Sequence, residues 1–253
     1  MDVRHIRLKI AYDGTDFSGW QTQPGLPTIQ DSIESALERM TGQRPKLVGS
    51  GRTDAGVHAH AQIASFYTVS QFQPVKFQNA LNAFLPDTIR ILDSDEVPIA
   101  FHPTLDVISK RYRYSVDNDR YGDPMAIRYA YHVGVPLNET EMVKASRYLV
   151  GRHDFAAFQT SGSERVSTVR RVFACEVMRL GSNFQIEVEA NGFLYNMVRT
   201  IAGTLIMVGK GKWQAHQVQE ILDSCDRRKA GPTASARGLA MLWVNYDQPR
   251  GIR

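Results

Sequence analysis

The chain of 253 residues contains only two cysteines, Cys175 and Cys225, and no uninterrupted apolar run of 18 residues. The two cysteines have no metal-ligand spacing, and their positions suit buried free thiols in a reducing compartment. The missing apolar run argues against a membrane-spanning helix. Residues 1–7 also lack the apolar segment of a secretory signal. We therefore expect a cytoplasmic protein.

The chain also lacks a large net charge of either sign. The formal net charge is +4 and the isoelectric point is about 9.1, so the composition allows an acidic partner without requiring one. Basic residues are nevertheless clustered in a way that suits binding to a phosphate backbone. The alternative is that they keep exposed strand faces soluble. The clusters are Arg111 with Arg113; Arg165 with Arg170 and Arg171; and Arg227 with Arg228 and Lys229.

Hydrophobic residues make up 43% of the chain, which is enough for a core in one large domain or two smaller ones. In the first half, the alternation over residues 6–12 predicts a strand, and Thr28 is placed to cap a helix that Gly42 ends. The other predicted elements of this half are strands at residues 46–48, 62–69 and 88–92 and a helix that begins at Pro74. The order is βαββαβ.

The second half repeats this order of elements without a matching sequence. Residues 112–116 alternate as a strand, and Asn138 is placed to cap a helix that we expect to end at Gly151. Residues 169–180 and 184–190 are predicted to form a hairpin. The remaining predictions are helices at residues 197–209 and 213–223 and a last strand at 239–245.

The repeated order predicts an α+β fold made of two tandem ferredoxin-like units, which resemble RNA-recognition modules. The expected boundaries are residues 1–105 and 106–253. We expect abutting, mostly antiparallel sheets with helices on one side and a catalytic cleft on the other, because this type of sheet leaves one face free for a ligand.

One loop of the first half places a carboxylate beside a guanidinium between two predicted strands. Its glycines allow a ligand to come close to the main chain. The spacing does not fit a dinucleotide fingerprint, which needs a helix after the loop, or a phosphate-binding loop, which needs Lys and then Ser or Thr. Asp54 is therefore a candidate catalytic group, with a plain Asp turn as the alternative. The loop is Gly49-Ser50-Gly51-Arg52-Thr53-Asp54-Ala55-Gly56-Val57-His58-Ala59.

The loop and several other motifs together resemble the tRNA pseudouridine synthase A family. The similarity runs from about Arg4 to Tyr246. One departure is that Ser235 and Ala240 stand where many members have proline and an aromatic residue, which concerns packing at the edge of the cleft. The other motifs are Tyr12-Asp13-Gly14, Gly19-Trp20-Gln21, Phe101-His102, Lys110-Arg111-Tyr112-Arg113-Tyr114, Asn196-Met197-Val198-Arg199 and Ile201-Ala202-Gly203.

This resemblance implies a homodimeric enzyme without a cofactor or metal, which isomerises uridine to pseudouridine at positions 38 to 40 of the tRNA anticodon stem-loop. Asp54 would be the nucleophile, because a carboxylate can stabilise an electron-poor C1′ or add to the ribose or the base. Arg199 would pair with Asp54 and keep it ionised. Tyr112 would stack on the target base and help to take the C5 proton, with a core position on its strand as the alternative.

Substrate binding is predicted for further residues besides Tyr112. Arg52 would help to fill the space left by the flipped uridine, with a phosphate contact as the alternative. The other predicted substrate-binding residues are His58, Arg111, Arg170 and Arg171.

Two other classes of function stay open at this point. His58 and His60 with Asp54 would suit a metal-assisted hydrolase or nuclease, although no Glu or Cys cluster completes the ligands. A tandem of recognition-like folds would also suit a noncatalytic RNA-binding module, although the aromatic and glycine pattern of such sheets is absent from the expected strands. Metal content and a catalytic assay on unmodified tRNA separate the three classes.

Overall fold

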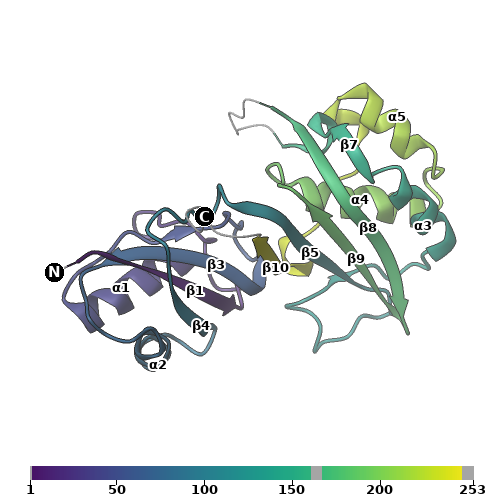
Figure 1. Ribbon diagram of the computed structural model, residues 1–253. Helices are drawn as coiled ribbons and strands as arrows, with labels where there is room; N and C mark the ends of the chain where they lie inside the picture. The colour runs from purple at the N-terminus through teal and green to yellow at the C-terminus, as the bar shows by residue number, and fades with distance from the viewer. Residues whose placement is uncertain (1, 161–166, 247–253) are drawn as a thin grey trace. The chain divides into compact units, whose positions relative to one another are not determined.

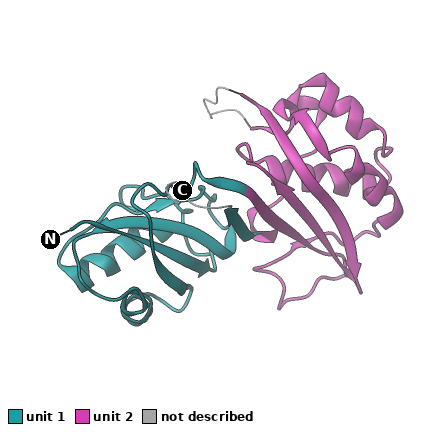
Figure 2. Ribbon diagram, in the orientation of Figure 1, with its two compact units in different colours: residues 1–108, 241–253 teal, residues 109–240 magenta. Residues whose placement is uncertain are grey.

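The computed structural model of the chain describes residues 2–160 and 167–246 and has an α+β fold. It divides into two compact units (Figure 2). Unit 1 comprises residues 1–108 and 241–253, and unit 2 comprises residues 109–240. No helix within the described ranges has the length and apolar character that a membrane span needs.

The strands of unit 1 are hydrogen-bonded in the order β4-β1-β3-β10, and β1 is antiparallel to both of its neighbours. β2 pairs with β3 in the antiparallel direction, with Val48 opposite Ser65 and Gly49 opposite Ala64. The elements are β1 (Arg4–Tyr12), α1 (Ile29–Thr41), β2 (Val48–Gly49), β3 (His58–Thr68), α2 (Pro74–Phe84), β4 (Ile89–Val97) and β10 (Leu239–Tyr246) (Figure 1). The predicted order βαββαβ is therefore correct for this half of the chain.

The core of unit 1 follows from the strand and helix periods that the sequence displays. Side chains that alternate along β1 are fully buried, and the apolar stripes of α1 and α2 are buried as well. The predicted cap of α1 is confirmed, because the Thr28 side chain accepts the Asp31 N–H at 3.3 Å and Gly42 ends the helix with a φ of 73°. The buried set includes Ile6, Leu8, Ile10, Ile29, Ile33, Leu37, Phe77 and Leu81.

Unit 2 has a sheet in the order β5-β9-β8-β7, and β6 pairs with β5 in parallel. The hairpin of β8 and β9 is confirmed, with Gly181 at a φ of 64° in its turn. α4 is buried along almost its whole length. The elements are β5 (Val107–Asp117), β6 (Tyr131–His132), α3 (Glu139–Arg147), β7 (Gly151–Asp154), β8 (Val169–Leu180), β9 (Asn183–Ala190), α4 (Met197–Gly209) and α5 (Gln217–Ser224), with short 3-10 turns at Ala156–Phe158, Arg227–Lys229 and Ala236–Gly238.

Two predictions for unit 2 are wrong. α3 ends at Arg147 rather than at Gly151, and Gly151, with a φ of 122°, begins the strand β7. β7 was missed because its four residues lack an apolar alternation, so only its pairing with β8 makes it a strand. Cys225 was expected on the buried side of a helix, but it follows α5 in a left-handed conformation and is exposed. Cys175 is buried as predicted, and burial raises the pKa of its thiol to about 12.

The last strand, β10, follows unit 2 in the sequence but belongs to unit 1 from Met241 onward. It belongs there because it is hydrogen-bonded to β3, a strand of unit 1. The compact units therefore differ from two consecutive halves of the chain, because the C-terminal strand returns to the N-terminal unit.

Candidate functional site

The loop of residues 49–59, here called the Asp54 loop, connects β2 with β3 in unit 1, and Thr53 anchors it. The Thr53 carbonyl accepts the Trp20 N–H at 3.0 Å, and the Thr53 hydroxyl lies 2.7 Å from the Tyr12 hydroxyl. Both hydroxyls are buried, and burial raises the pKa of Tyr12, so this contact stays uncharged. Asp54 comes next, is half-buried, and accepts the Val57 N–H at its carbonyl at 3.1 Å. The main chain is thus fixed on both sides of the carboxylate.

Glycines of two motifs shape this loop. Gly56 has a φ of 77°, which suits the tight turn expected after Asp54. Gly19 has a φ of 97°, and a Cβ atom there would lie 2.7 Å from the Thr53 carbonyl oxygen. Gly49, which we expected to let a ligand approach, is instead approached by the Trp20 ring of the same unit, 2.8 Å from where its Cβ would stand.

Gln62 on β3 holds the start of the loop and was missed in the sequence analysis. Its side-chain oxygen accepts the Ser50 hydroxyl, and its side-chain nitrogen donates to the Gly51 carbonyl at 2.9 Å. The Ser50 N–H also donates to the Ile63 carbonyl at 2.7 Å. Gln62 and Ser50 are fully buried. The available signal was a lone amide followed by Ile63 and Ala64 in a predicted strand, because a buried amide needs hydrogen-bond partners.

His58 lies inside unit 1 rather than on its surface. Its Nδ1 atom accepts the Gly14 N–H at 3.1 Å and lies 3.1 Å from the Asp13 carboxylate, and the residue is 7% exposed. These contacts connect the Asp54 loop to the motif that follows β1 and favour a structural role for His58. His60 and Arg52 are exposed. Within residues 2–160 and 167–246, no group of three or more His, Cys, Asp or Glu side chains is arranged to hold a metal ion.

Tyr112 and Arg199 lie in unit 2. Tyr112 is opposite Val188 on β9, is 7% exposed, and contacts Phe193 edge to face with the ring centres 5.0 Å apart. Arg199 on the first turn of α4 is half-buried, and its guanidinium donates to the Ala234 carbonyl and to the Asn196 side chain, both at 2.8 Å. These two hydrogen bonds hold the guanidinium against the first turn of α4 and the segment at Ala234.

Arg111 belongs to a network of ion pairs on β5, β9 and β8. Its guanidinium contacts Glu187 at 2.6 Å, Glu176, and Glu189 at 3.6 Å, and Arg113 contacts Glu187 at 2.7 Å. Burial raises the pKa of Glu187, but hydrogen bonds from Arg113 and Arg111 outweigh this effect and hold the pKa below its ordinary value. A phosphate contact by Arg111 would have to compete with three carboxylates.

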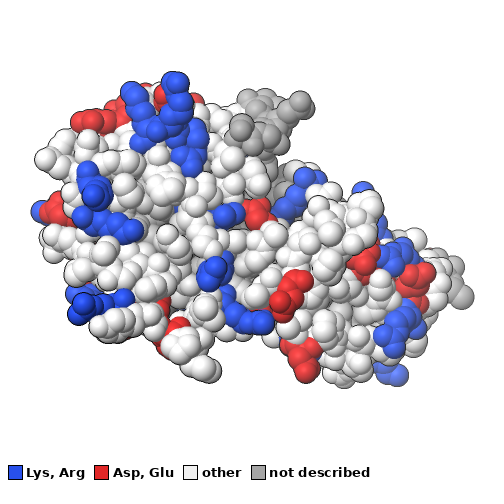
Figure 3. Space-filling view, turned by 180° about the vertical axis from the view of Figure 1, so that it is seen from behind, with Lys and Arg blue, Asp and Glu red and all other residues white. Residues whose placement is uncertain are grey.

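Arg170 and Arg171 are adjacent on β8 and point to opposite faces of the sheet. Arg170 is half-buried and donates to the Ser167 and Val169 carbonyls at 3.0 and 2.7 Å. Arg171 is exposed, and its guanidinium carbon lies 5.6 Å from the centre of the Phe173 ring. Arg165 lies outside the described residues. On the face of the molecule drawn in Figure 3, basic side chains form several small groups, some of which adjoin acidic ones.

The structure thus brings Arg52, Asp54 and His58 together in one loop of unit 1. The other predicted site residues, Tyr112, Arg111, Arg170, Arg171 and Arg199, belong to unit 2.

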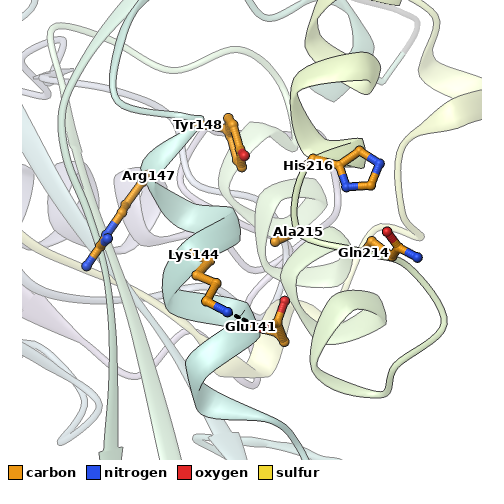
Figure 4. A pocket seen from close by; sticks show the side chains of 7 residues that line it. All are labelled: Glu141, Lys144, Arg147, Tyr148, Gln214, Ala215 and His216. Carbon is orange, nitrogen blue, oxygen red and sulfur yellow. Dashed lines mark hydrogen bonds and ion pairs between the residues drawn. The ribbon is translucent and has the colours of Figure 1, made fainter.

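A hollow of about 420 Å³ lies in unit 2 between α3 and the segment that leads into α5 (Figure 4). In this view the Lys144 ammonium points toward Glu141, with which it forms an ion pair of 2.7 Å. None of the predicted site residues lines this hollow. Its lining residues are Glu141, Lys144, Arg147, Tyr148, Gln214, Ala215 and His216.

Comparison with known proteins identifies the family. A family model described as tRNA pseudouridine synthase matches residues 9–106 and 145–247. The tRNA pseudouridine synthase A of Brevibacillus brevis is 47% identical over 96% of this chain and 100% of its own length. The tRNA pseudouridine synthase A 2 of Clostridium tetani is 46% identical over 97% of this chain and 100% of its own length. A solved archaeal box H/ACA sRNP Nop10-Cbf5 complex matches with a TM-score of 0.35 and 11% identity over 95% of this chain and 47% of that chain, which is too weak to support a conclusion. From the family model and the two relatives, the chain belongs to the tRNA pseudouridine synthase family.

Proposed function

We propose that this chain isomerises uridine to pseudouridine at positions 38 to 40 in the anticodon stem-loop of tRNA, with Asp54 as the nucleophile. Family membership supports the reaction and the substrate class. The assignment to Asp54 is carried by one observation, the way its loop is held. Buried hydrogen bonds fix Thr53 and the Asp54 carbonyl, while Asp54 as a residue is only half-buried. A group on such a frame can be presented to a substrate with little loss of conformational entropy.

The reaction needs no outside electron donor or acceptor. The bond between N1 of uracil and C1′ of ribose breaks, the base turns, and C5 forms the new bond to C1′. The proton on C5 is lost and N1 gains one, so atoms and electrons balance within the nucleotide. A carboxylate assists this sequence by adding to C1′ or to the base and leaving again at the end. The target uridine has to leave its stack before any of these steps.

Two residues of unit 2 are proposed to assist. Arg199 would pair with Asp54 and keep it ionised, and this role is supported by the hydrogen bonds from its guanidinium to the Ala234 carbonyl and the Asn196 side chain, which hold the group in place. Tyr112 would contact the target base, and its hydroxyl would help to move the C5 proton. A Tyr112→Phe variant should then bind tRNA normally and turn over about 10² to 10⁴ times more slowly. Wild-type turnover would make Tyr112 a packing residue, which its contact with Phe193 also permits.

We further propose that the enzyme is a cytoplasmic homodimer. β4 is an edge strand of unit 1 and β7 is an edge strand of unit 2, and such edge strands are often covered in symmetric assemblies. Both cysteines are free, which suits a reducing compartment. Light scattering across the micromolar range tests the dimer, and a fully active monomer at every concentration would disprove it.

The central test is to map pseudouridine in an unmodified tRNA transcript after incubation with the pure protein. Asp54→Asn should lower the rate by about 10⁴-fold or more, the order of effect seen when an enzyme loses its nucleophile. The loop should keep its shape, because Thr53 and the glycines set the turn. Asp87→Asn is the matched control, since the Asp87 side chain is fully exposed in the same unit and pairs only with Arg90 among the described residues.

The control variant should show wild-type rates, and both variants should bind tRNA and melt like the wild type. If Asp54→Asn kept more than a tenth of the wild-type rate, after deamidation had been excluded by mass spectrometry, Asp54 would not be the nucleophile.

A further inference from the structure

Two arginines face each other across β7 and β8 in unit 2. The antiparallel register places Arg152 directly opposite Arg171. Side chains paired in this way leave the same face of the sheet, with their Cβ atoms about 5 Å apart. Both residues are exposed. Like charges in this position repel each other and destabilise the strand pair, so the arrangement needs an explanation other than stability.

The carboxylates on this face of the sheet are engaged elsewhere. Asp154 shares the face with Arg152, but its carboxylate accepts the Ala156 N–H at 2.9 Å. The acidic residues on β8 and β9, which are Glu176, Glu187 and Glu189, contact Arg111. Throughout the ranges 2–160 and 167–246, no carboxylate forms an ion pair with Arg152 or Arg171. Their two positive charges therefore remain available to an external anion.

Neighbouring residues fix Arg171 in place. Phe173 stands two residues after Arg171 on β8 and therefore shares its face of the sheet, where it is 41% exposed and lies under the Arg171 guanidinium at 5.6 Å. This contact of a cation with an aromatic ring keeps the guanidinium close to the sheet. Asn191 holds the backbone of Arg171 on both sides, since it accepts the N–H at 2.9 Å and donates to the carbonyl at 3.1 Å.

We propose that Arg152 and Arg171 clamp a backbone phosphate of the bound tRNA, while the Phe173 ring packs beneath the Arg171 guanidinium and keeps it in place. The proposal rests on the proposed function, because that function supplies the RNA. Two guanidinium groups on one rigid sheet face complement a phosphodiester, which accepts paired hydrogen bonds from such forks. Contacts of this kind set the position of an RNA and do not read its sequence. Arg170 is not part of the clamp, because its side chain leaves the opposite face.

Salt dependence of tRNA binding tests the clamp directly. The variants are Arg152→Ala, Arg171→Ala and the double substitution, measured with an unmodified tRNA between 50 and 300 mM salt. Loss of one phosphate contact should reduce the slope of log Kd against log salt by about 0.7 to 0.9. The double variant should bind about tenfold more weakly at the low-salt end, and the factor should be the same for different tRNA sequences.

Arg179→Ala is the matched control on the same strand. Arg179 is exposed, its guanidinium lies 5.5 Å from the Phe184 ring, and its register partner Phe184 is fully buried. It therefore resembles Arg171 in charge and in its aromatic neighbour, but it lies at the other end of β8 and on the other face. Its removal should change neither the slope nor the affinity.

Thermal unfolding of the free protein provides a second readout. Removal of either clamp arginine relieves a repulsion, so the variants should melt at the wild-type temperature or slightly above it. Weaker RNA binding combined with undiminished stability separates a lost contact from a damaged fold. An unchanged salt slope in the double variant, or an equal loss in Arg179→Ala, would overturn the clamp.

The clamp and the proposed function fail in distinguishable ways. If the wild type makes pseudouridine and the double variant has the same KM and the same slope, only the clamp is wrong. If the clamp variants weaken RNA binding but the wild type forms no pseudouridine, only the proposed function is wrong. With both correct, the double variant should raise KM and keep kcat, because a contact that only positions the RNA contributes equally to the bound substrate and to the transition state.

Discussion

The two units hold their charged groups in different ways. In unit 1 the part of the Asp54 loop around Thr53 is held by uncharged groups, namely the Tyr12 and Thr53 hydroxyls, the Gln62 amide and main-chain N–H groups, while His58 at the end of the loop contacts the Asp13 carboxylate. In unit 2 the guanidinium of Arg111 is held by carboxylates, of which Glu187 is the most buried.

This difference shows why a count of arginines does not measure the capacity to bind RNA. Arg111 and Arg113 look like a basic cluster in the sequence, yet Glu187 contacts both of them. Arg152 and Arg171 are 19 positions apart in the sequence, and they lie side by side only because β7 pairs with β8 in this register.

The largest effect on stability should come from breaking the charged network. Glu187→Ala leaves Arg111 and Arg113 partly buried without their shared carboxylate, and loss of one partner of such a pair should cost about 3 kcal/mol. Glu220→Ala is the control, because the Glu220 side chain is 66% exposed in the same unit and contacts only His216 among the described residues. Denaturant unfolding of both variants measures the difference. A loss below about 1 kcal/mol for Glu187→Ala would show that the network is a surface feature.

The same network predicts a dependence of stability on pH. Because the pKa of Glu187 is lower in the folded protein than in the unfolded chain, its contribution is fully present above the ordinary Glu pKa of about 4.3. The contribution is lost as the pH falls through the lowered folded pKa. The stability difference between wild type and Glu187→Gln should therefore be constant from pH 6 to 8 and shrink below about pH 4. A difference that did not change with pH would contradict the charged interaction.

An intermediate effect on stability is expected at Gly19, where the main chain packs closely against the Thr53 carbonyl of the Asp54 loop. In Gly19→Ala the new methyl group would lie 2.7 Å from the Thr53 carbonyl oxygen at a φ of 97°, which should cost about 2 to 3 kcal/mol and displace the loop. Gly42→Ala is the matched control, since Gly42 has a φ of 73° with no atom near the site of its Cβ. It should cost about 1 kcal/mol without a change in turnover. Equal turnover in the two variants would mean that the position of Thr53 does not matter for catalysis.

Local signals predicted much of the fold correctly. Thr28 and Gly42 delimit α1, Pro74 begins α2, and Gly181 turns the hairpin of β8 and β9, because caps, prolines and tight turns act within a few residues. β7 was missed because its strand character comes only from pairing with β8. The return of β10 to unit 1 likewise depends on its neighbour β3, far away in the sequence.

For the candidate site, the sequence predicted the motifs but not the side-chain contacts that hold them in place. Asp54 and its loop were recognised from a contiguous stretch with a resemblance to a known family. The hydrogen bond of Tyr12 to Thr53 spans 41 positions, and the contact of Arg111 with Glu187 spans 76. A single sequence does not indicate which polar side chains at such separations meet, so the contacts of His58 with Gly14 and Asp13 were not predicted.

A smaller loss of stability is expected when the Tyr12 hydroxyl, which contacts the Thr53 hydroxyl, is removed. Tyr12→Phe removes the partner of the buried Thr53 hydroxyl and should cost about 1 to 1.5 kcal/mol, the usual size for a neutral hydrogen bond. Tyr67→Phe is the control, because the Tyr67 hydroxyl donates to the Ile99 carbonyl at the surface of the same unit. Turnover should fall in Tyr12→Phe and stay unchanged in Tyr67→Phe. If both variants lost stability but neither lost activity, the frame would serve folding alone.

The smallest effect is expected for an ion-pair network that resembles that of Arg111 in composition and differs in burial. Arg44 in unit 1 lies 2.7 Å from Asp31, 3.2 Å from Glu38 and 3.9 Å from Glu34, so it too has three carboxylates.

The Arg44 side chain is 39% exposed, whereas that of Arg111 is 18% exposed. Solvent screening should therefore reduce the loss in Arg44→Gln to less than about 1 kcal/mol, and 1 M salt should abolish it. Unfolding of Arg44→Gln and Glu187→Ala at 0.1 and 1 M salt compares the two networks. If Arg44→Gln cost as much as Glu187→Ala and kept that cost at high salt, the number of carboxylates rather than their burial would determine how strongly an arginine is held in this protein.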